Sequence, residues 1–273
     1  MSAASLPIGV FDSGVGGLTV LNALTAALPA ESFLYLGDTA RLPYGTKSAD
    51  TVIRYATRAS HLLVERGIKA LVVACNTASA AALPALRERF AGLPILGVVE
   101  PGARRACELT RSGSIAVIAT ESTVAGGAYQ RAIHAILPNA RISARAAQLF
   151  VALAEEGWTS GTVVRAAAHA YLDSLFTAAE ARPDTLLLGC THFPVLAPVL
   201  AQVVGPAVTV VDASDAVAAA LREALEERQL LAASPRPGSL ELMATDGVER
   251  FARVGAIFLG RALRPEDVRL VDL

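Results

Sequence analysis

Two cysteines stand where apolar runs give way to polar residues. Cys75 ends the run ALVVAC (70–75), and Cys190 ends the run TLLLGC (185–190). The polar pairs that follow them are Asn76-Thr77 and Thr191-His192. A buried free cysteine is commonly a small hydrophobe, and Cys107, within a predicted helix, fits that interpretation. The matching positions of Cys75 and Cys190 at predicted strand ends favour chemistry instead.

The chemistry open to two such thiols is proton transfer. A free thiol has a pKa of about 8.5, and a helix N-terminus or a nearby imidazole can shift its balance between thiol and thiolate. His192, two residues after Cys190, is the candidate proton partner. One thiolate and one thiol can take a proton from one face of a carbon acid and return one to the other, which inverts a stereocentre. Disulfide exchange, the alternative, needs the sulfurs close together, which a separation of 115 residues neither requires nor forbids.

Other polar residues suit an amino-acid ligand. The segment FDSGVGG (11–17) places Asp12 and Ser13 at a strand end, before a glycine-rich turn into a helix. There, backbone N–H groups and hydroxyls can hold an anion while the carboxylate meets an ammonium. The turn lacks the spacing and the lysine of a phosphate-binding loop, which disfavours a nucleotide. Tyr44 and Gly45, in a Pro-Tyr-Gly turn, either border the same cleft or form a plain surface turn.

Composition bounds the class of protein. Of 273 residues, 53% are hydrophobic and 18% are charged, and no apolar run approaches the length of a membrane span. The net charge is −1 with the basic residues scattered, so a nucleic-acid partner is disfavoured. Three widely spaced cysteines without zinc-site spacing predict free thiols and no metal. The N-terminus lacks a basic stretch followed by a long apolar one, so we expect a cytoplasmic protein.

Short apolar runs alternate with helix-length segments along the chain. The runs are rich in Val, Ile and Leu, as in parallel strands that are buried on both faces. They are IGVF (8–11), FLYLGD (33–38), ALVVAC (70–75), PILGVV (94–99), SIAVIAT (114–120), TLLLGC (185–190) and VTVVD (208–212). Residues 51–67 carry an apolar stripe and close on a glycine, which predicts a helix. The alternation predicts an α/β fold with parallel sheets.

The two halves of the chain resemble each other. Both cysteine segments run strand, cysteine, polar pair and then an Ala/Leu/Pro-rich stretch. The matched pairs are 71–86 with 186–200, 8–17 with 115–127, and 97–101 with 210–214. They indicate a duplication with a period of roughly 110 residues, with chance matching of generic strand–turn–helix pieces as the alternative. Ligands of open α/β sheets lie beyond the carboxyl ends of the strands, so two facing halves would place Cys75 and Cys190 on opposite sides of one cleft.

Several motifs, in order, make the chain similar to the glutamate racemases, pyridoxal-independent enzymes of peptidoglycan precursor synthesis. The matching segments are IGVFDSGVGGLTVL, YLGDTARLPYGTKS, LVVACNTASA, GVVEPG, GAYQRAI and LLLGCTHFPVL. The resemblance implies two like parallel-sheet α/β domains around a pseudo-twofold axis, with the active site in the cleft between them. It further implies a discontinuous first domain of residues 1–98 and 213–273, and a second domain of residues 99–212.

The resemblance also implies roles for single residues. Cys75 would take the proton from D-glutamate and Cys190 from L-glutamate, assisted by Asp12 and His192. Glu155 would be an additional acidic residue, although Glu156 competes for that place and either glutamate can be a plain solvated charge. The positions that match the family's substrate contacts are Asp12, Ser13, Tyr44, Gly45, Asn76, Thr77, Thr191 and His192. No cofactor is expected, and a homodimer is an expectation from the family.

Two departures from the family pattern lie outside these motifs. Many relatives carry Cys-Pro-Leu where this chain has Ala147-Gln148-Leu149, and a small-residue position is Ala119. We expect neither departure to touch the cysteines or the substrate motifs. Residues 214–273 match weakly, and a helix over 214–231 is predicted from its pattern alone.

The sequence leaves two other functions open. The first is a racemase of the same superfamily that acts on another substrate, such as aspartate or a hydantoin. The second is a regulatory protein that binds an acidic amino acid without turnover.

Overall fold

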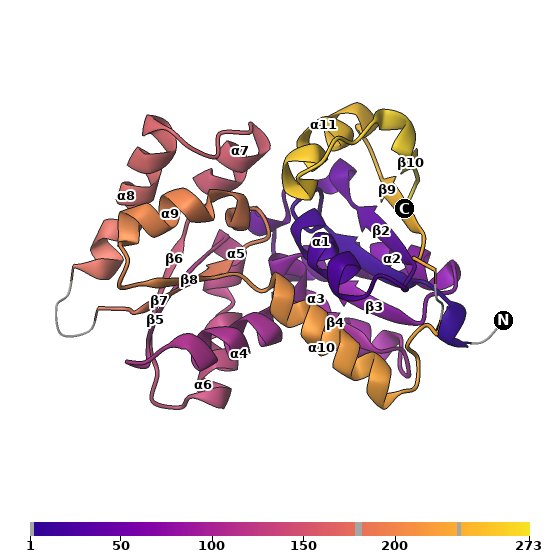
Figure 1. The fold of residues 1–273 in the computed structure, drawn as a ribbon, viewed down its shortest axis with the longest axis horizontal. Helices are drawn as coiled ribbons and strands as arrows, with labels where there is room; N and C mark the ends of the chain where they lie inside the picture. The colour runs from indigo at the N-terminus through magenta and orange to yellow at the C-terminus, as the bar shows by residue number, and fades with distance from the viewer. Residues whose placement is uncertain (1–2, 178–181, 234–235) are drawn as a thin grey trace.

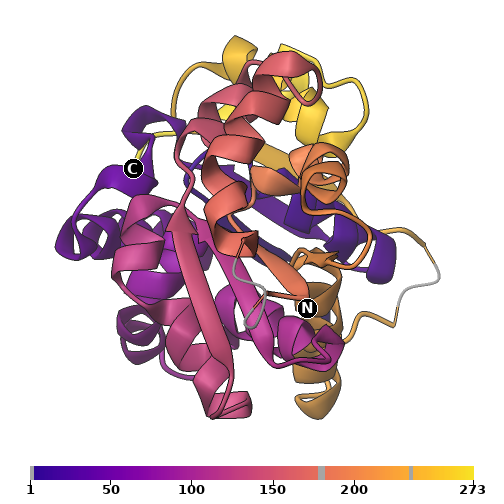
Figure 2. The ribbon, with the colours of Figure 1, turned by 90° about the vertical axis from the view of Figure 1, so that its left-hand side faces the viewer.

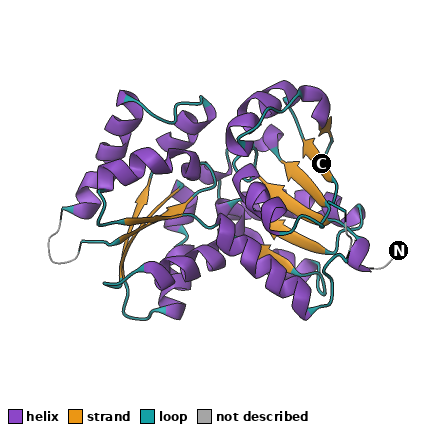
Figure 3. Cartoon of the chain, viewed as in Figure 1, coloured by secondary structure: helices purple, strands orange, loops and turns teal. Residues whose placement is uncertain are grey.

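The computed structural model describes residues 3–177, 182–233 and 236–273, and its strands form two separate sheets. Sheet A has six strands in the order β10-β9-β2-β1-β3-β4, and sheet B has four in the order β6-β5-β7-β8. Every strand pairing in both sheets is parallel. Helices surround both sheets (Figures 1 and 3). The predicted fold class, two similar parallel-sheet α/β units, is confirmed.

Lobe A consists of sheet A and the helices packed on it. Its strands are β1 (Ile8–Asp12), β2 (Phe33–Gly37), β3 (Ala70–Val73), β4 (Ile95–Gly97), β9 (Leu240–Ala244) and β10 (Val268–Leu270). Its helices are α1 (Leu18–Ala27), α2 (Ala49–Glu65), α3 (Asn76–Arg89), α10 (Ser214–Glu227) and α11 (Val248–Leu259). One hydrophobic cluster joins the sheet to α1, α10 and α11, and another joins it to α2 and α3. The sheet is therefore buried on both faces, as the apolar runs predict.

Lobe B consists of sheet B and its own helices; Figure 2 turns this lobe toward the viewer. Its strands are β5 (Ser114–Ala119), β6 (Arg141–Ala146), β7 (Thr185–Gly189) and β8 (Thr209–Val211). Its helices are α4 (Val99–Leu109), α5 (Glu121–Ala125), α6 (Ala128–Ile136), α7 (Leu149–Glu155), α8 (Thr162–Phe176) and α9 (Ala197–Val204). Helices α7, α8 and α9 share one hydrophobic cluster with the sheet, and α4 and α6 share the other.

The two sheets repeat one strand order. The order β2-β1-β3-β4 in sheet A is matched by β6-β5-β7-β8 in sheet B. Phe11 pairs with Val73 in sheet A, and Ile118 pairs with Leu188 at the corresponding place in sheet B. Each cysteine lies two residues beyond the second member of its pair. The registers therefore make Cys75 equivalent to Cys190, as the sequence duplication predicts. They also make Asp12 equivalent to Ala119 and Ser13 equivalent to Thr120.

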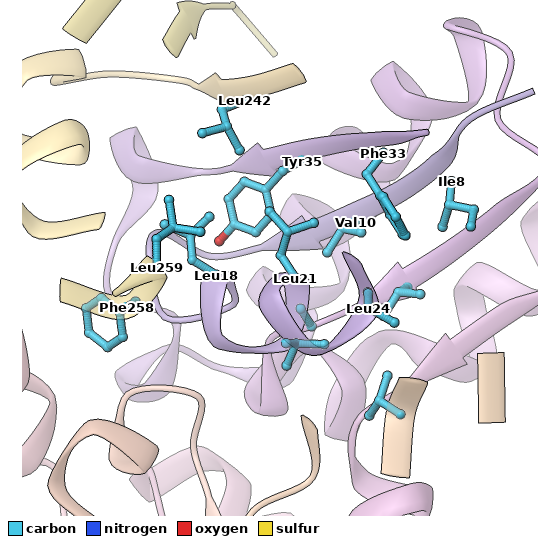
Figure 4. Packing of buried hydrophobic residues seen from close by; sticks show 14 of the residues in the cluster. Ile8, Val10, Leu18, Leu21, Leu24, Phe33, Tyr35, Leu242, Phe258 and Leu259 are labelled. Carbon is cyan, nitrogen blue, oxygen red and sulfur yellow. The ribbon is translucent and has the colours of Figure 1, made fainter. Parts of the chain in front are cut away.

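The core of lobe A shows how these strands are held. Leu18, Leu21 and Leu24 on α1 point toward Val10 and Tyr35 on the sheet (Figure 4), and all five residues are fully buried. Full burial of such a side chain contributes about 1.5–3 kcal/mol. This packing fixes the carboxyl ends of β1 and β3, from which the candidate site residues extend.

The seven predicted strands are all present, each within two residues of the expected bounds. Three further strands, β6, β9 and β10, were not predicted. β6 reads RISARA and is exposed or half-buried along its length, while β10 is largely exposed. Both lie at sheet edges. An edge strand needs no continuous apolar run. The search for apolar runs, which predicts the central strands, therefore does not detect β6 and β10.

Two predicted helices are confirmed with shifted ends. The helix expected over 51–67 is α2, which begins earlier because the Ser48 hydroxyl accepts a hydrogen bond from the Thr51 N–H. The helix expected over 214–231 is α10, which ends at Glu227, shortly before Gln229 takes a positive φ of 56°. The predicted domain boundaries after residues 98 and 212 stay a prediction, although β9 and β10 do join the sheet of β1–β4.

A buried ion pair ties distant segments of lobe A together. Lys69 Nζ lies 2.5 Å from Glu31 Oε2, and the two side chains are only 1% and 2% exposed. The ammonium also donates to the carbonyl oxygens of Ala4 and Leu230. Glu31 accepts a further hydrogen bond from the N–H of Ala232. One charge pair thus joins the start of β3 to the N-terminal turn and to the segment after α10.

Lys69→Met should strongly destabilise the fold. The variant leaves the Glu31 carboxylate buried without its partner, which costs about 3–5 kcal/mol. Urea unfolding followed by circular dichroism measures this loss. Arg105→Met is the control, because Arg105 and Glu108 form a pair at 3.1 Å with both side chains about half exposed. Such a pair is worth at most about 1 kcal/mol. Equal, small losses for the two variants would contradict the structural role of Lys69.

Candidate active site

A small cavity lies between the two lobes and is lined by both cysteines. Its volume is about 30 Å³. The predicted site residues that line it are Ser13, Tyr44, Gly45, Cys75, Asn76, Thr77, Cys190, Thr191 and His192. Most of them directly follow β1, β3 or β7, where the carboxyl ends of parallel strands expose their side chains. The structure therefore brings two thiols from two different sheets to one cavity.

Two glycines allow the lobes to come this close. A Cβ on Gly16 would lie 2.5 Å from His192 Nδ1 and 2.6 Å from Thr191 Oγ1. A Cβ on Gly45 would lie 2.7 Å from the Cβ of Thr120. Both contacts would lie between lobe A and lobe B, and both are shorter than the distances that real Cβ atoms keep from other atoms. The glycine-rich turn after β1 is thus required for close packing against the residues that follow Cys190.

Cys75 lies in a fully buried environment beside a carboxyl group. Its thiol donates to the Ser13 hydroxyl at 3.5 Å and accepts from the Ala78 N–H at 3.4 Å. Burial, together with the charge of Asp12, raises the pKa of Cys75 to about 12. Cys75 is therefore a neutral thiol when nothing else is bound beside it.

Asp12 is itself a perturbed group. Burial raises the pKa of its carboxyl, against the lowering effects of the His192 charge and of nearby backbone N–H groups. One oxygen accepts from the Gly14 N–H at 2.8 Å. The other, Oδ1, is buried without a hydrogen-bond partner among the described residues. Asp12 does not line the cavity directly but supplies charge behind Cys75.

Cys190 lies next to a chain of charged groups that runs through His192 and Glu155 to Arg250. Its sulfur lies 3.8 Å from His192 Nδ1, and His192 Nε2 lies 3.1 Å from Glu155 Oε1. The second oxygen of Glu155 accepts from Arg250 of α11 at 2.8 Å. Burial alone lowers the pKa of His192, but the hydrogen bonds to Cys190 and Glu155 outweigh it and raise that pKa to about 10. His192 is therefore an imidazolium at neutral pH.

Glu155 holds its negative charge at the centre of this chain. Burial acts to raise its pKa, but the hydrogen bonds and charges of His192 and Arg250 prevail and lower it. Glu156, one residue further, is exposed to solvent. Of the two candidates for the auxiliary acidic residue, the geometry selects Glu155.

Several cavity residues already have hydrogen-bond partners. The Asn76 amide donates to the Tyr129 hydroxyl at 2.6 Å. The hydroxyl of Thr77 lies 2.9 Å from that of Thr120 across the lobe boundary. The Tyr44 hydroxyl donates to Asp38 at 2.6 Å. That bond anchors the turn that carries Gly45, so the hydroxyl of Tyr44 is already paired.

Three site residues escaped the sequence prediction: Thr120, Gln148 and Arg250. Thr120 and Gln148 line the cavity, and Arg250 completes the chain to Glu155. The expectation that the Ala147-Gln148-Leu149 departure lies apart from the cysteines was wrong for Gln148, because α7 begins at the cavity wall. The duplication could have predicted Thr120, because Thr120 occupies the position in lobe B that Ser13 occupies in lobe A.

Within residues 3–177, 182–233 and 236–273, no group of three or more His, Cys, Asp or Glu side chains is placed to hold a metal ion. Over the same residues, no helix is long and apolar enough to cross a membrane. The cavity is lined by two thiols, one imidazolium and a set of hydroxyl and amide groups, and the carboxyl groups of Asp12 and Glu155 lie behind Cys75 and His192.

Comparison with known proteins agrees with this fold. Residues 8–221 match the family model of the Asp/Glu/Hydantoin racemases. A glutamate racemase from Geobacter metallireducens is 49% identical over 266 residues, which cover 97% of this chain and 96% of the relative. The crystal structure of a glutamate racemase isoform from Bacillus anthracis has a TM-score of 0.92, at 34% identity and 98% coverage of both chains. The structure of the Francisella tularensis glutamate racemase in complex with D-glutamate has a TM-score of 0.89, at 34% identity, and covers 99% of this chain and 98% of the relative.

The fold and the full-length relatives are those of an amino-acid racemase, an isomerase. The chain belongs to the Asp/Glu/Hydantoin racemase family.

Glu155→Gln should lower the pKa of His192 from its value of about 10. Without the carboxylate, one of the two hydrogen bonds that favour the imidazolium no longer has a charged partner, and burial then weighs more. Titration of the His192 ring by NMR measures the change. Glu156→Gln is the control and should leave this pKa in place, because Glu156 is exposed and makes no contact with the ring. If His192 still titrates near pH 10 in Glu155→Gln, Glu155 does not hold the imidazole in its charged form.

The same shift predicts how stability depends on pH. The folded protein keeps the His192 proton up to about pH 10, whereas an unfolded histidine releases it near pH 6.5. The stability contributed by this group is therefore complete below about pH 6.5 and is lost as the pH rises toward 10. Between pH 7 and 9, the free energy of unfolding should fall less steeply in Glu155→Gln than in the wild type.

Proposed function

We propose that the protein interconverts L-glutamate and D-glutamate by proton transfer between the substrate's α-carbon and two thiols, without a cofactor. The observation that carries the proposal is that Cys75 and Cys190, from different lobes, line one small cavity. The curated relatives that match nearly the whole chain are glutamate racemases. A solved relative holds D-glutamate, which supports the same substrate here.

In the proposed reaction each cysteine serves one face of the substrate. Cys75 removes the α-proton of D-glutamate: the C–H bond breaks and an S–H bond forms. Cys190 then gives its proton to the opposite face of the same carbon, and its sulfur is left as a thiolate. With L-glutamate the roles reverse, and Cys190 is the base. No electrons are exchanged with any other group, so the cycle needs no oxidant or reductant.

The charges around the two sulfurs fit these roles. Before it can act as a base, Cys75 must lose a proton, and the buried Asp12 carboxylate is the acceptor on its side. His192 is the proton donor beside Cys190, at 3.8 Å from its sulfur. Glu155 keeps that imidazole charged and oriented. Asp12 and His192 are thus proposed to assist Cys75 and Cys190, respectively.

The weak acidity of the substrate's α-hydrogen is the main energetic barrier to this reaction. The α-hydrogen of an amino acid is far less acidic than a thiol, so the negative charge that develops on the carbon and its carboxylate must be stabilised. Fixed donors in a dry cavity do this without reorganising during the reaction. We assign this role to the hydroxyl, amide and backbone groups of Ser13, Asn76, Thr77 and Thr191. General acid–base catalysis supplies only about 10²–10⁴-fold, so these donors carry much of the rate.

The cavity must enlarge before the substrate enters. A cavity needs about 10–15 Å³ to hold one water molecule, so the observed volume of about 30 Å³ has room for about two. Glutamate does not fit into that space. We propose that the structure represents the closed arrangement of the lobes and that substrate enters when they separate.

The biological role follows from the resemblance to glutamate racemases. We propose that the enzyme supplies D-glutamate for peptidoglycan synthesis, acts in the cytoplasm and works as a homodimer. The two rival functions predict different behaviour. A racemase for aspartate or a hydantoin would exchange the α-hydrogen of that substrate and leave glutamate untouched. A non-catalytic binding protein would exchange neither.

Cys75→Ala and Cys190→Ala should each reduce racemisation of glutamate at least about 10²-fold, because each removes one acid/base group. Circular dichroism of the reaction mixture measures inversion, and NMR in heavy water measures deuterium at the α-carbon. Cys107→Ala is the control, since Cys107 lies on α4 outside the cavity and should keep wild-type rates.

Two results would overturn the proposal. Near-wild-type racemisation by either cysteine variant would eliminate the two-thiol mechanism. Exchange of aspartate but not of glutamate by the wild-type enzyme would transfer the activity to another substrate.

A further inference from the structure

The side chain of Gln148 lines the cavity and has no part in the proposed proton transfer. It stands immediately before α7 and shares the cavity wall with Cys75 and Cys190. Its amide oxygen is buried and has no hydrogen-bond partner among the described residues. An unsatisfied buried polar group costs about 1–3 kcal/mol unless something binds it. A polar group kept unpaired in a substrate cavity is therefore a candidate ligand-binding group.

The position of Gln148 in sheet B indicates which part of the substrate it meets. Gln148 follows β6, which is separated from β7 by the single strand β5. Neighbouring strands lie about 4.8 Å apart, so the carboxyl end of β6 is about 10 Å from that of β7. Cys190 follows β7 directly. Gln148 thus stands at the opposite end of the lobe B wall from the sulfur that works on the α-carbon.

The lobe A wall at that end is the turn at Gly45. A Cβ on Gly45 would lie 3.2 Å from Gln148 Oε1, so the amide lies directly against the turn. Thr120, at the end of β5, meets the same glycine. The groups near the α-carbon follow β1, β3 and β7, whereas Gln148, Thr120 and Gly45 form a separate polar end of the cavity. A substrate held at its α-carbon between the sulfurs can direct its side chain to that end.

We propose that Gln148 is a substrate-binding residue that recognises the distal carboxylate of the substrate and so helps to set the specificity for an acidic side chain. The inference rests on the proposed function, whose site it completes. The two ends of a side-chain amide have nearly the same shape, and a half-turn exchanges the acceptor Oε1 for the donor Nε2. With Nε2 turned inward, a neutral amide donates to the carboxylate without adding a like charge.

Gln148→Glu and Gln148→Met test this role. Glutamate at this position keeps the shape but replaces the donor with a carboxylate that repels the substrate's own, and methionine removes the donor with little change in volume. A hydrogen bond to a charged group corresponds to about 10- to 100-fold in binding. We expect KM for glutamate to rise at least about 10-fold in both variants, more in Gln148→Glu, with kcat changed less than about 3-fold.

Substrate selectivity separates recognition from a structural effect. Glutamine carries an amide where glutamate carries its distal carboxylate, and that amide can donate to the carboxylate in Gln148→Glu. Inhibition constants for glutamine and KM for glutamate should therefore move in opposite directions in this variant, whereas a loosened site weakens both ligands. Gln202→Leu is the matched control, because Gln202 is an exposed glutamine on α9 and should leave every constant unchanged.

The failure of this inference and that of the proposed function are distinguishable. If wild-type enzyme racemises glutamate but both Gln148 variants keep KM within about 2-fold, the role of Gln148 is refuted and the function stands. Parallel losses for glutamate and glutamine would also refute it. A wild-type enzyme that does not racemise glutamate would overturn the proposed function itself.

Discussion

The structure depends on one constraint: two sulfurs that belong to different sheets reach the same small cavity. The backbones of the two lobes therefore have to touch, and they do so at Gly16 and Gly45, where no Cβ can be accommodated. At Gly16 the missing side chain makes room for His192 and Thr191, which belong to the opposite lobe. The glycine-rich turn, which lacks the spacing and the lysine of a phosphate-binding loop, thus serves contact between the lobes. Its neighbours Asp12 and Ser13 stand beside Cys75 because β1 and β3 are paired strands of sheet A.

A nearly symmetric scaffold carries an asymmetric set of charges. The two sheets share a strand order, so Cys75 and Cys190 occupy equivalent positions, but the residues around them differ in kind. The equivalent of Asp12 is the uncharged Ala119, and the residue two places after Cys75 is Thr77 where His192 follows Cys190. The two equivalent positions therefore give the thiols different neighbours, a carboxyl group beside Cys75 and an imidazolium beside Cys190.

The sequence predicted the central strands and the paired cysteines because both leave a local signal. Buried parallel strands are continuous apolar runs, and chemistry at their carboxyl ends stands next to them in the chain. Edge strand β6 carries arginines and no such run, so Gln148, which follows it, was placed outside the site. Arg250 reaches Glu155 across 95 residues and from another lobe, and nothing in the local sequence records that contact. Thr120 was recoverable from the duplication, since it takes the place of Ser13 in the second half.

The contacts between the lobes around the cavity are mainly polar, and this bears on how the site opens. Asn76 meets Tyr129, Thr77 meets Thr120, and Arg250 meets Glu155 across the boundary. A hydrogen bond of this kind contributes only about 0.5–1.5 kcal/mol net, because water replaces the lost partner, and an ion pair with a half-exposed arginine contributes at most about 1 kcal/mol. The large apolar side chains belong to clusters that lie mainly within single lobes. The proposed separation of the lobes would therefore exchange a few polar contacts for water and leave most of each hydrophobic core in place, so that a cavity too small for its substrate could open at low cost.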